Sequence, residues 1–351
     1  MKKQSDPVIK FFISVIGLVV LFIVLKELQH IFIPLVIAVF LFYVFEPLNR
    51  YLKKIKFPEW LASITDLLLI LAVLYGLSNL IIIQFSKFES ALPSYIMKLN
   101  NIVSTTAVSF GINDDAFTKF DLVTQLKALD YGGIAESFFS STLSIFNTTF
   151  FVLLFFLFVS SGYNIIYSAI KKWYQERASE DAEEKKTVLE DTFRNISKQI
   201  QNYVATKFLV SFLTSVLVGI ALWIFGIDFV LVWVVFTFLL NFIPNIGSFI
   251  AVILPTLMTL VQFESFGYTF LVAVIITAIQ NLIGNIVEPK IMGDRLGLNP
   301  LVILLSLLLW GYIWGIAGMF LSVPIASVAK IILSQSESKN LKFICNLMGN
   351  K

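Results

Sequence analysis

The residues best suited to chemistry lie where polar side chains interrupt long apolar stretches. Glu288, at the end of one such stretch, is the leading candidate. A carboxylate next to hydrocarbon is costly unless protein or water surrounds it, so it often marks a site. Amides that can hydrogen-bond a solute gather in the same half of the chain: Asn241, Asn245, Gln280, Asn281 and Asn285. We therefore expect a polar cavity with these six residues as transport-path candidates, although each amide could instead hold helices together.

Two kinds of transport chemistry fit these residue types. A cation/proton antiporter needs a carboxylate that releases a proton when it binds the cation, and burial makes such exchange possible. Glu288 leads for that role, followed by Glu46 and Asp228. The last two have simpler explanations, since Glu46 is four residues before Arg50 and Asp228 precedes an apolar run as a helix N-cap would. Export of a small polar molecule would instead use amides and free carbonyls, with no essential carboxylate.

The composition limits the classes of protein that remain. Hydrophobic residues make up 58% and charged residues 14%, with a mean hydropathy of +0.86, which is typical of an all-α polytopic membrane protein. One Cys and one His exclude a disulfide framework or a multi-histidine metal site. Because no catalytic or nucleotide-binding motif is present, we expect no enzyme activity, no cofactor and no nucleic-acid partner. A passive oligomeric channel remains a further alternative.

The apolar segments predict about eight membrane segments and an external helical region. Basic residues concentrate at the N-terminus, after the second segment, in a linker and in the tail, which predicts that both termini are cytoplasmic. In the linker, Leu189, Phe193, Ile196, Ile200 and Tyr203 form one helical stripe. The predicted parts are N-terminal transmembrane helices (1–85), an extracytoplasmic helical region (86–142), a transmembrane helix (143–162), a cytoplasmic amphipathic linker (163–205), a C-terminal transmembrane core (206–333) and a cytoplasmic tail (334–351).

Two segments of the second half share one design. Residues 239–257 and 308–327 each contain an apolar helix, a break with Gly or Pro, and a second apolar helix with an internal proline, Pro255 or Pro324. Short, interrupted apolar segments of this kind point to broken or re-entrant helices at a transport site. At a break, carbonyls and amides leave the helix ladder and can face a solute.

The same half of the chain carries a motif that resembles a known family. The pattern P-x-x-x-G-D-[KR]-L-G-L-x-P comprises Pro289, Gly293, Asp294, Arg295, Leu296, Gly297, Leu298 and Pro300. Further matches are Pro244, Gly247, Gly315, Gly318 and Pro324. Together they resemble the autoinducer-2 exporter family of bacterial membrane transporters, over essentially the whole chain and most specifically over 195–333.

The resemblance implies a permease-like protein of the bacterial inner membrane that forms a homo-oligomer in the lipid bilayer. Some members resemble exporters of the signal autoinducer-2, and others resemble sodium(lithium)/proton antiporters. The expected partner is therefore a small solute or a monovalent cation and a proton. The motif residues listed above are expected to be structural, with Asp294 and Arg295 pinning a loop.

Overall fold

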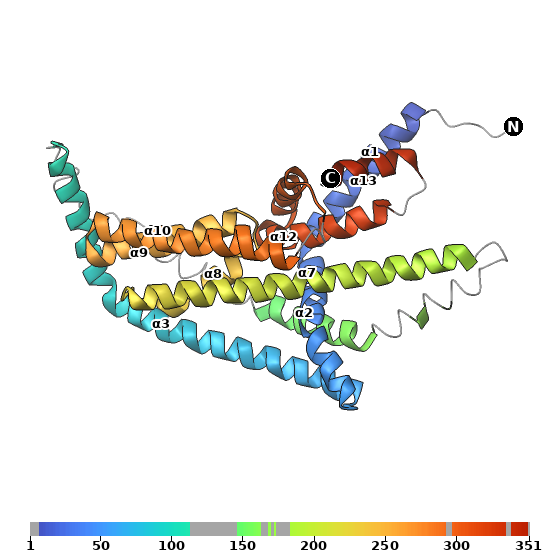
Figure 1. Cartoon of the computed structure of the whole chain (residues 1–351), viewed down its shortest axis with the longest axis horizontal. Coiled ribbons are helices and arrows are strands. Elements are labelled where there is room, and N and C mark those ends of the chain that lie inside the picture. Colours follow the sequence, from blue (N-terminus) through green and yellow to red (C-terminus); the bar gives the residue numbers. More distant parts are fainter. Residues whose placement is uncertain are drawn as a thin grey trace. The chain divides into compact units, whose positions relative to one another are not determined.

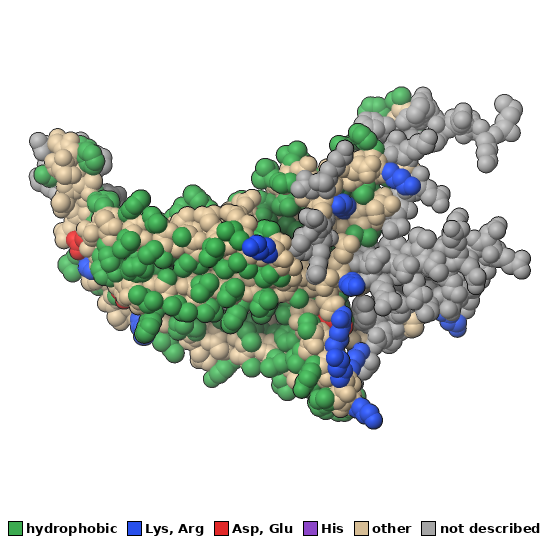
Figure 2. Space-filling view, in the orientation of Figure 1, with side chains coloured by type: hydrophobic (Ala, Val, Ile, Leu, Met, Phe, Trp, Pro, Cys, Tyr) green, Lys and Arg blue, Asp and Glu red, His purple; other side chains and the backbone are tan. Residues whose placement is uncertain are grey.

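The fold is all-α, as the composition predicts. The computed structural model describes residues 7–112, 146–162, 168–169, 172, 183–292, 297–334 and 338–349, and the regular elements there are helices. Within those ranges six helices are long and apolar enough to cross a membrane, and two shorter apolar helices, Phe146–Gly162 and Val230–Leu240, accompany them. Figure 2 shows wide areas of exposed hydrophobic side chains, which is the surface that a bilayer would cover.

The chain divides into two compact units, each built from segments that are distant in sequence. One comprises Met1–Ser63, Ile145–Val204 and Arg295–Lys351, and the other comprises Ile64–Ser144 and Ala205–Asp294. We call them unit 1 and unit 2. Two long helices, α3 (Glu59–Ser109) and α7 (Glu183–Ile224), contribute residues to both units.

Unit 1 contains α1 (Pro7–Glu27), α2 (Gln29–Lys54), α12 (Pro300–Ser334) and α13 (Lys339–Met348) (Figure 1). Buried Trp314 of α12 joins α12 to the first two helices. Its indole Nε1 donates to the Leu25 carbonyl over 2.9 Å, and its ring stacks on Phe32. In α2, Arg50 Nε lies 3.0 Å from Glu46 Oε1, which confirms the predicted ion pair between neighbouring turns.

Unit 2 contains α8 (Val230–Leu240), α9 (Ile246–Phe263), α10 (Phe266–Leu282), a π-helix η2 (Ile283–Val287) and α11 (Glu288–Met292). The helices α8, α9 and α10 pack in sequence order, α9 against both of its neighbours. A core of buried aliphatic residues holds α7 against α10: Val218, Leu222, Ile227, Val272 and Ile276. This packing fixes the rotation of α7 and α10 about their own axes, which decides what faces the interior.

Both predicted helix breaks are present. The first separates α8 from α9, and the second is a non-helical residue inside α12, Gly315, with φ 59° and ψ −138°. A glycine follows each break where the returning helix meets a carbonyl of the preceding one. A Cβ on Gly247 would lie 1.7 Å from the Leu240 oxygen, and a Cβ on Gly318 would lie 1.9 Å from the Trp310 oxygen. The two hairpins thus depend on the same kind of close contact, between a glycine and a backbone carbonyl of the preceding helix.

Other predicted features fall partly or wholly outside the described residues. Helix α3 runs without interruption to Ser109, well into the region predicted to lie outside the membrane. The motif residues Gly293, Asp294 and Arg295 lie outside the described residues, as do the side chains of Leu189, Phe193 and Ile196 in the linker.

Pro289 is exposed in α11, Gly297 precedes the bridge at Leu298, and Pro300 begins α12. Pro244 lies in the turn before α9, and Pro324 lies inside α12.

Candidate functional site

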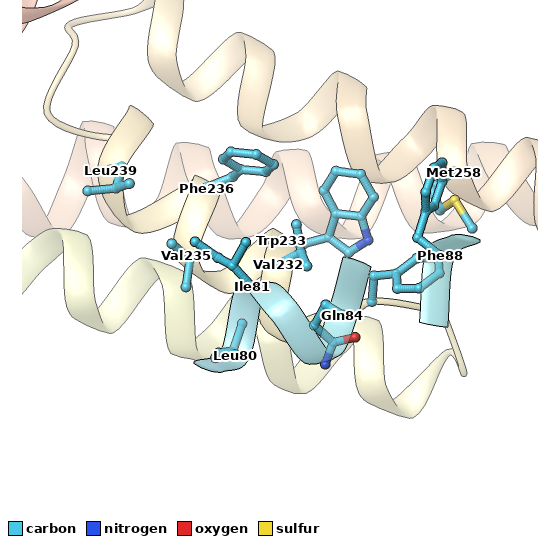
Figure 3. Close-up of a pocket in the computed structure, with 11 residues that line it drawn as sticks. Leu80, Ile81, Gln84, Phe88, Val232, Trp233, Val235, Phe236, Leu239 and Met258 are labelled. Carbon is cyan, nitrogen blue, oxygen red and sulfur yellow. The ribbon is translucent and has the colours of Figure 1, made fainter. Parts of the chain in front are cut away.

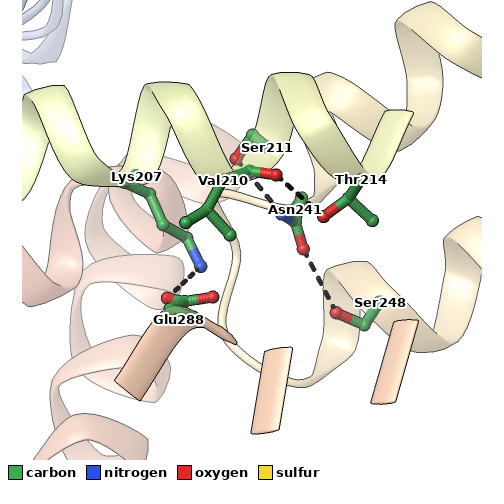
Figure 4. A network of polar contacts seen from close by, with 7 residues as sticks. All are labelled: Lys207, Val210, Ser211, Thr214, Asn241, Ser248 and Glu288. Carbon is green, nitrogen blue, oxygen red and sulfur yellow. Dashed lines mark hydrogen bonds and ion pairs between the residues drawn. The ribbon is translucent and has the colours of Figure 1, made fainter. Parts of the chain in front are cut away.

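One face of α7 presents buried polar side chains to the interior of unit 2. Lys207, Ser211 and Thr214 follow one another at spacings of four and three residues, so they share a helical face (Figure 4). All three are buried, and from Phe208 onward the one other hydroxyl residue of the helix is Ser215, which donates to the Phe212 carbonyl of its own helix. Thr214 satisfies its hydroxyl locally by donating to the Val210 carbonyl over 2.8 Å. Lys207 and Ser211 instead contact other helices.

Lys207 forms an ion pair with Glu288. The Lys207 Nζ lies 2.7 Å from Glu288 Oε1, and the two side chains are only 8% and 18% exposed. Charges removed from water in this way are tolerated because each neutralises the other. Removing one partner would leave the second charge buried alone, which typically costs about 3–5 kcal/mol. The pair is therefore a strong constraint on how α7 meets the end of α10.

The π-helix η2 places Glu288 on the interior face. Along α10 the buried stripe runs through Val272, Ile276, Gln280 and Ile283, so an unbroken α-helix would continue it at Val287. One π turn takes in an additional residue, and the stripe reaches Glu288 instead. Such single-turn π segments occur frequently at functional sites. Here the extra residue is what aims a carboxylate at Lys207.

A second set of polar contacts surrounds Asn241 at the end of α8. It reaches α7 at Ser211, one helical turn beyond Lys207. Asn241 is the C-cap residue of α8 and is buried. Its Nδ2 donates to Ser211 Oγ over 3.2 Å, and its Oδ1 accepts from Ser248 Oγ over 3.4 Å. Ser248 belongs to the first turn of α9, so the amide joins α7 to both sides of the α8–α9 break. This network and the ion pair together form our candidate site (Figure 4).

The other predicted amides occupy different places. Gln280 is buried on the interior stripe, and its Nε2 has no hydrogen-bond partner among the residues that the structure describes. Asn281 and Asn285 are exposed on another face and bond to each other, Asn285 Nδ2 to Asn281 Oδ1 at 2.9 Å. Of these three amides, only Gln280 lies toward the interior of unit 2.

Asn245 has a strained backbone. Its φ of 60° and ψ of −52° make it the centre of a γ-turn, closed by the Ile246 N–H donating to the Pro244 carbonyl over 2.6 Å. Such positive-φ conformations cost energy and persist where surrounding structure holds them. The Asn245 side chain is exposed within unit 2. The residue thus forms the turn between α8 and α9 and stays outside the Asn241 network.

The interpretation of Asp228 as a helix N-cap is wrong. The N-cap of α8 is Phe229, in a left-handed conformation and without a side-chain cap bond. The Asp228 carboxylate instead accepts from the Tyr95 hydroxyl over 2.6 Å, and its backbone N–H donates to Gln262 Oε1. Both partners are distant in sequence, so a local capping rule could not identify them. Asp228 therefore connects α3 to the α7–α8 turn.

Sequence reasoning missed Lys207, although a signal was present. Lys207 is the single charged residue between Lys198 and Asp228. A lone charge inside an apolar segment is by default a candidate for a functional site with a partner of opposite charge. The candidate for that partner, Glu288, had already been identified.

The pocket between α3 and α8 has a different character. It measures about 420 Å³, and Gln84 is the single polar side chain among the residues that line it (Figure 3). Leu80 and Ile81 face Trp233 and Phe236 across it. Such a lining offers almost nothing to a polar solute. The polar site on α7 therefore remains the candidate.

Long apolar helices, two broken hairpins that each close on a glycine, and a buried ion pair beside an amide network define a polytopic helical protein of the transporter class. The family model described as AI-2E family transporter matches residues 11–338. The chain therefore belongs to the AI-2E transporter family.

Its relatives agree with this assignment. A Haemophilus influenzae protein whose name describes transport is 31% identical over 348 residues, covering 96% of each chain. A Borreliella burgdorferi protein with the same kind of name is 33% identical over 314 residues, covering 88% of this chain and 82% of its own. The Escherichia coli AI-2 transport protein TqsA is 26% identical over 331 residues, covering 91% and 90%.

Proposed function

We propose that this protein exports a small, uncharged, oxygen-rich solute across the bacterial inner membrane. The observation that carries the proposal is the buried Lys207–Glu288 ion pair beside the Ser211–Asn241–Ser248 network. The charges of the pair cancel, so the site has no net charge to attract an ion. What it offers is a set of hydrogen-bond donors and acceptors in a dry setting, where an unmatched polar group is costly.

Gln280 adds a hydrogen-bond donor that no residue in the described part of the chain uses. Its Nε2 is buried and lacks a partner among the described residues, and buried polar groups in native structures are normally satisfied. An oxygen of a bound solute would satisfy it. Autoinducer-2 is the first solute to test, because the name of TqsA assigns AI-2 transport to that relative.

The direct test is efflux of autoinducer-2 from cells that produce it and carry this transporter as their single exporter. Asn241→Leu removes the amide at nearly constant volume, and we expect it to abolish most of the export. Asn281→Leu is the matched control, because Asn281 is exposed and outside the network. Equal export by both variants, at equal amounts of protein in the membrane, would refute the assignment of the site.

Exchange of sodium or lithium for protons is the second candidate function. It is favoured by one observation, that Glu288 lies within the membrane-spanning segment 266–291. A cation that binds Glu288 would have to displace the Lys207 ammonium. Sodium-dependent proton movement in proteoliposomes tests this directly. No exchange by the wild type excludes antiport, and undiminished exchange by Glu288→Gln excludes Glu288 from it.

We further propose that the protein is a homo-oligomer with both termini in the cytoplasm. Exposed Arg50, Lys53, Lys54 and Lys56 cluster at the end of α2, which Figure 2 shows as a group of blue side chains. Such clusters favour the cytoplasmic side. A passive oligomeric channel is the alternative to a transporter. Such a channel would show single-channel conductance in planar bilayers without coupling to any ion gradient.

A further inference from the structure

The C-terminal helix α13 packs back against the rest of unit 1. It packs against α12, and the thiol of buried Cys345 donates to the Lys330 carbonyl over 3.6 Å. Its end is fixed a second time, because the Asn299 N–H donates to the Met348 carbonyl over 2.9 Å and Leu298 pairs with Gly349. The helix thus has a defined orientation, held at its middle and at its end.

The apolar surface of α13 is wider than the part that packs against the protein. Cys345 is 9% exposed, whereas Phe343, Ile344 and Leu347 are 63%, 44% and 58% exposed. These three residues are neighbours on a helix, since Phe343 and Leu347 are four apart. Lys342 and Asn346, also four apart, form a polar face. The helix therefore presents one packed side, one free apolar side and one polar side.

The place of α13 in the chain indicates what covers the free apolar side. The apolar second half of α12 ends at Ser334, and α13 begins at Lys339. So short a connection keeps α13 close to the level at which α12 leaves the hydrocarbon. The charge of the segment points the same way, since residues 338–351 contain Lys339, Lys342 and Lys351 and no acidic residue. Basic amphipathic helices of this kind bind anionic lipid surfaces.

We propose that α13 lies in the membrane interface and inserts Phe343, Ile344 and Leu347 between the lipids, with Lys342 at anionic headgroups. The anchored helix also holds Leu298 and Asn299, two residues at the end of the motif that joins Glu288 to α12. The proposal is independent of the transported solute.

The test measures the depth of α13 in the full-length protein by spin labelling. Cys345 is the single cysteine, so Cys345→Ser gives a background for labels at Phe343→Cys, Leu347→Cys and Asn346→Cys. In nanodiscs that contain phosphatidylglycerol, we expect labels at 343 and 347 to collide several-fold more often with oxygen than with a water-soluble nickel chelate. The label at 346 should show the reverse preference. A preference for the nickel chelate at all three positions would overturn the proposal.

Two further measurements distinguish anionic headgroups, and a second copy of the protein, as contacts of α13. Replacing Lys339 and Lys342 by Gln should reduce the oxygen preference at 343 in phosphatidylglycerol nanodiscs, and have little effect in pure phosphatidylcholine. An equal effect in both lipids would overturn the headgroup assignment. Spin–spin broadening at 343 that disappears on dilution with unlabelled protein would show that a second copy covers α13 instead of lipid.

Discussion

At the scale of single residues, the candidate site depends on the pairing of Lys207 with Glu288. The two residues are 81 positions apart and bond over 2.7 Å, with both side chains largely buried. In such a setting a matched pair and an apolar replacement of both residues can be similarly stable, whereas a single unmatched charge is not. Because replacing both residues can leave the protein stable whereas replacing one cannot, single and double variants distinguish the role of the pair in folding from its role in transport.

Stability measurements on this pair should therefore be strongly non-additive. Lys207→Met alone should destabilise the protein by about 3–5 kcal/mol, because Glu288 remains buried without its partner. Lys207→Met combined with Glu288→Gln should recover most of that loss. Thermal unfolding in detergent with both single variants and the double variant measures the coupling. If the double variant is as unstable as the sum of the singles, the pair is not a coupled buried contact.

The two hairpin glycines lead to a prediction about packing. Gly318→Ala would place a Cβ 1.9 Å from a backbone oxygen, so the backbone itself would have to shift, and Gly247→Ala has the same conflict. We expect each to cost at least about 2–3 kcal/mol and to lower the yield of folded protein. Gly267→Ala in α10 is the matched control, since a Cβ there would meet nothing within 4 Å. Similar melting temperatures for all three variants would contradict this packing.

At the scale of elements, the rotation of a helix decides whether a residue can take part in the site. Gln280 of α10 and Glu288 at the start of α11 face the interior of unit 2, while Asn281 of α10 and Asn285 of η2 share a different face. The π-helix is what extends the interior face to Glu288. A regular α-helix would have presented Val287 there, as described above.

The π turn predicts opposite outcomes for a deletion and an insertion. Deleting Asn285 should turn η2 into a regular α turn in which Glu288 follows Ile283 by four positions, so Glu288 still faces Lys207. Inserting one Ala after Asn285 should rotate Glu288 by about 100° and break the pair. Transport and thermal stability of the two variants report the outcome. Retained transport after the insertion, or its loss after deletion at unchanged protein level, would contradict this role of η2.

At the scale of the whole molecule, the exposed surface is typical of a protein embedded in a lipid bilayer. Large aliphatic and aromatic side chains are exposed along several helices of both units, and charged groups gather at helix ends such as the end of α2 (Figure 2). In hydrocarbon, only helices satisfy all of their own backbone polar groups. This is why the backbone of the α8–α9 break finds partners within the protein, where the Phe242 and Ile243 N–H groups donate to the Leu239 and Leu240 carbonyls.

The proposed orientation can be tested with single cysteines in the Cys345→Ser background. Lys54→Cys lies at the basic end of α2, and Phe110→Cys lies just after α3, where the Phe110 side chain is 78% exposed. In intact cells we expect a membrane-impermeant maleimide to label residue 110 and to reach residue 54 only after permeabilisation. The reverse pattern would show that the termini face outward.

By itself, the sequence determined the all-α membrane class, the positions of the two breaks and the family motif. These features are local, because they follow from runs of apolar residues, from glycine and proline, and from the demand that backbone groups in lipid find partners. The same local rules correctly paired Glu46 with Arg50. They failed at Asp228, whose partners come from α3 and α9.

Only the tertiary structure decided which polar residues meet. It joined Lys207 to Glu288, turned Asn241 and Gln280 inward, left Asn245, Asn281 and Asn285 exposed within unit 2, and folded α13 back onto α12. Hydropathy indicates that a helix is apolar, but not how it is rotated against its neighbours. That rotation is set by the packing of side chains from distant parts of the chain, and in α10 by a single extra residue in a π turn.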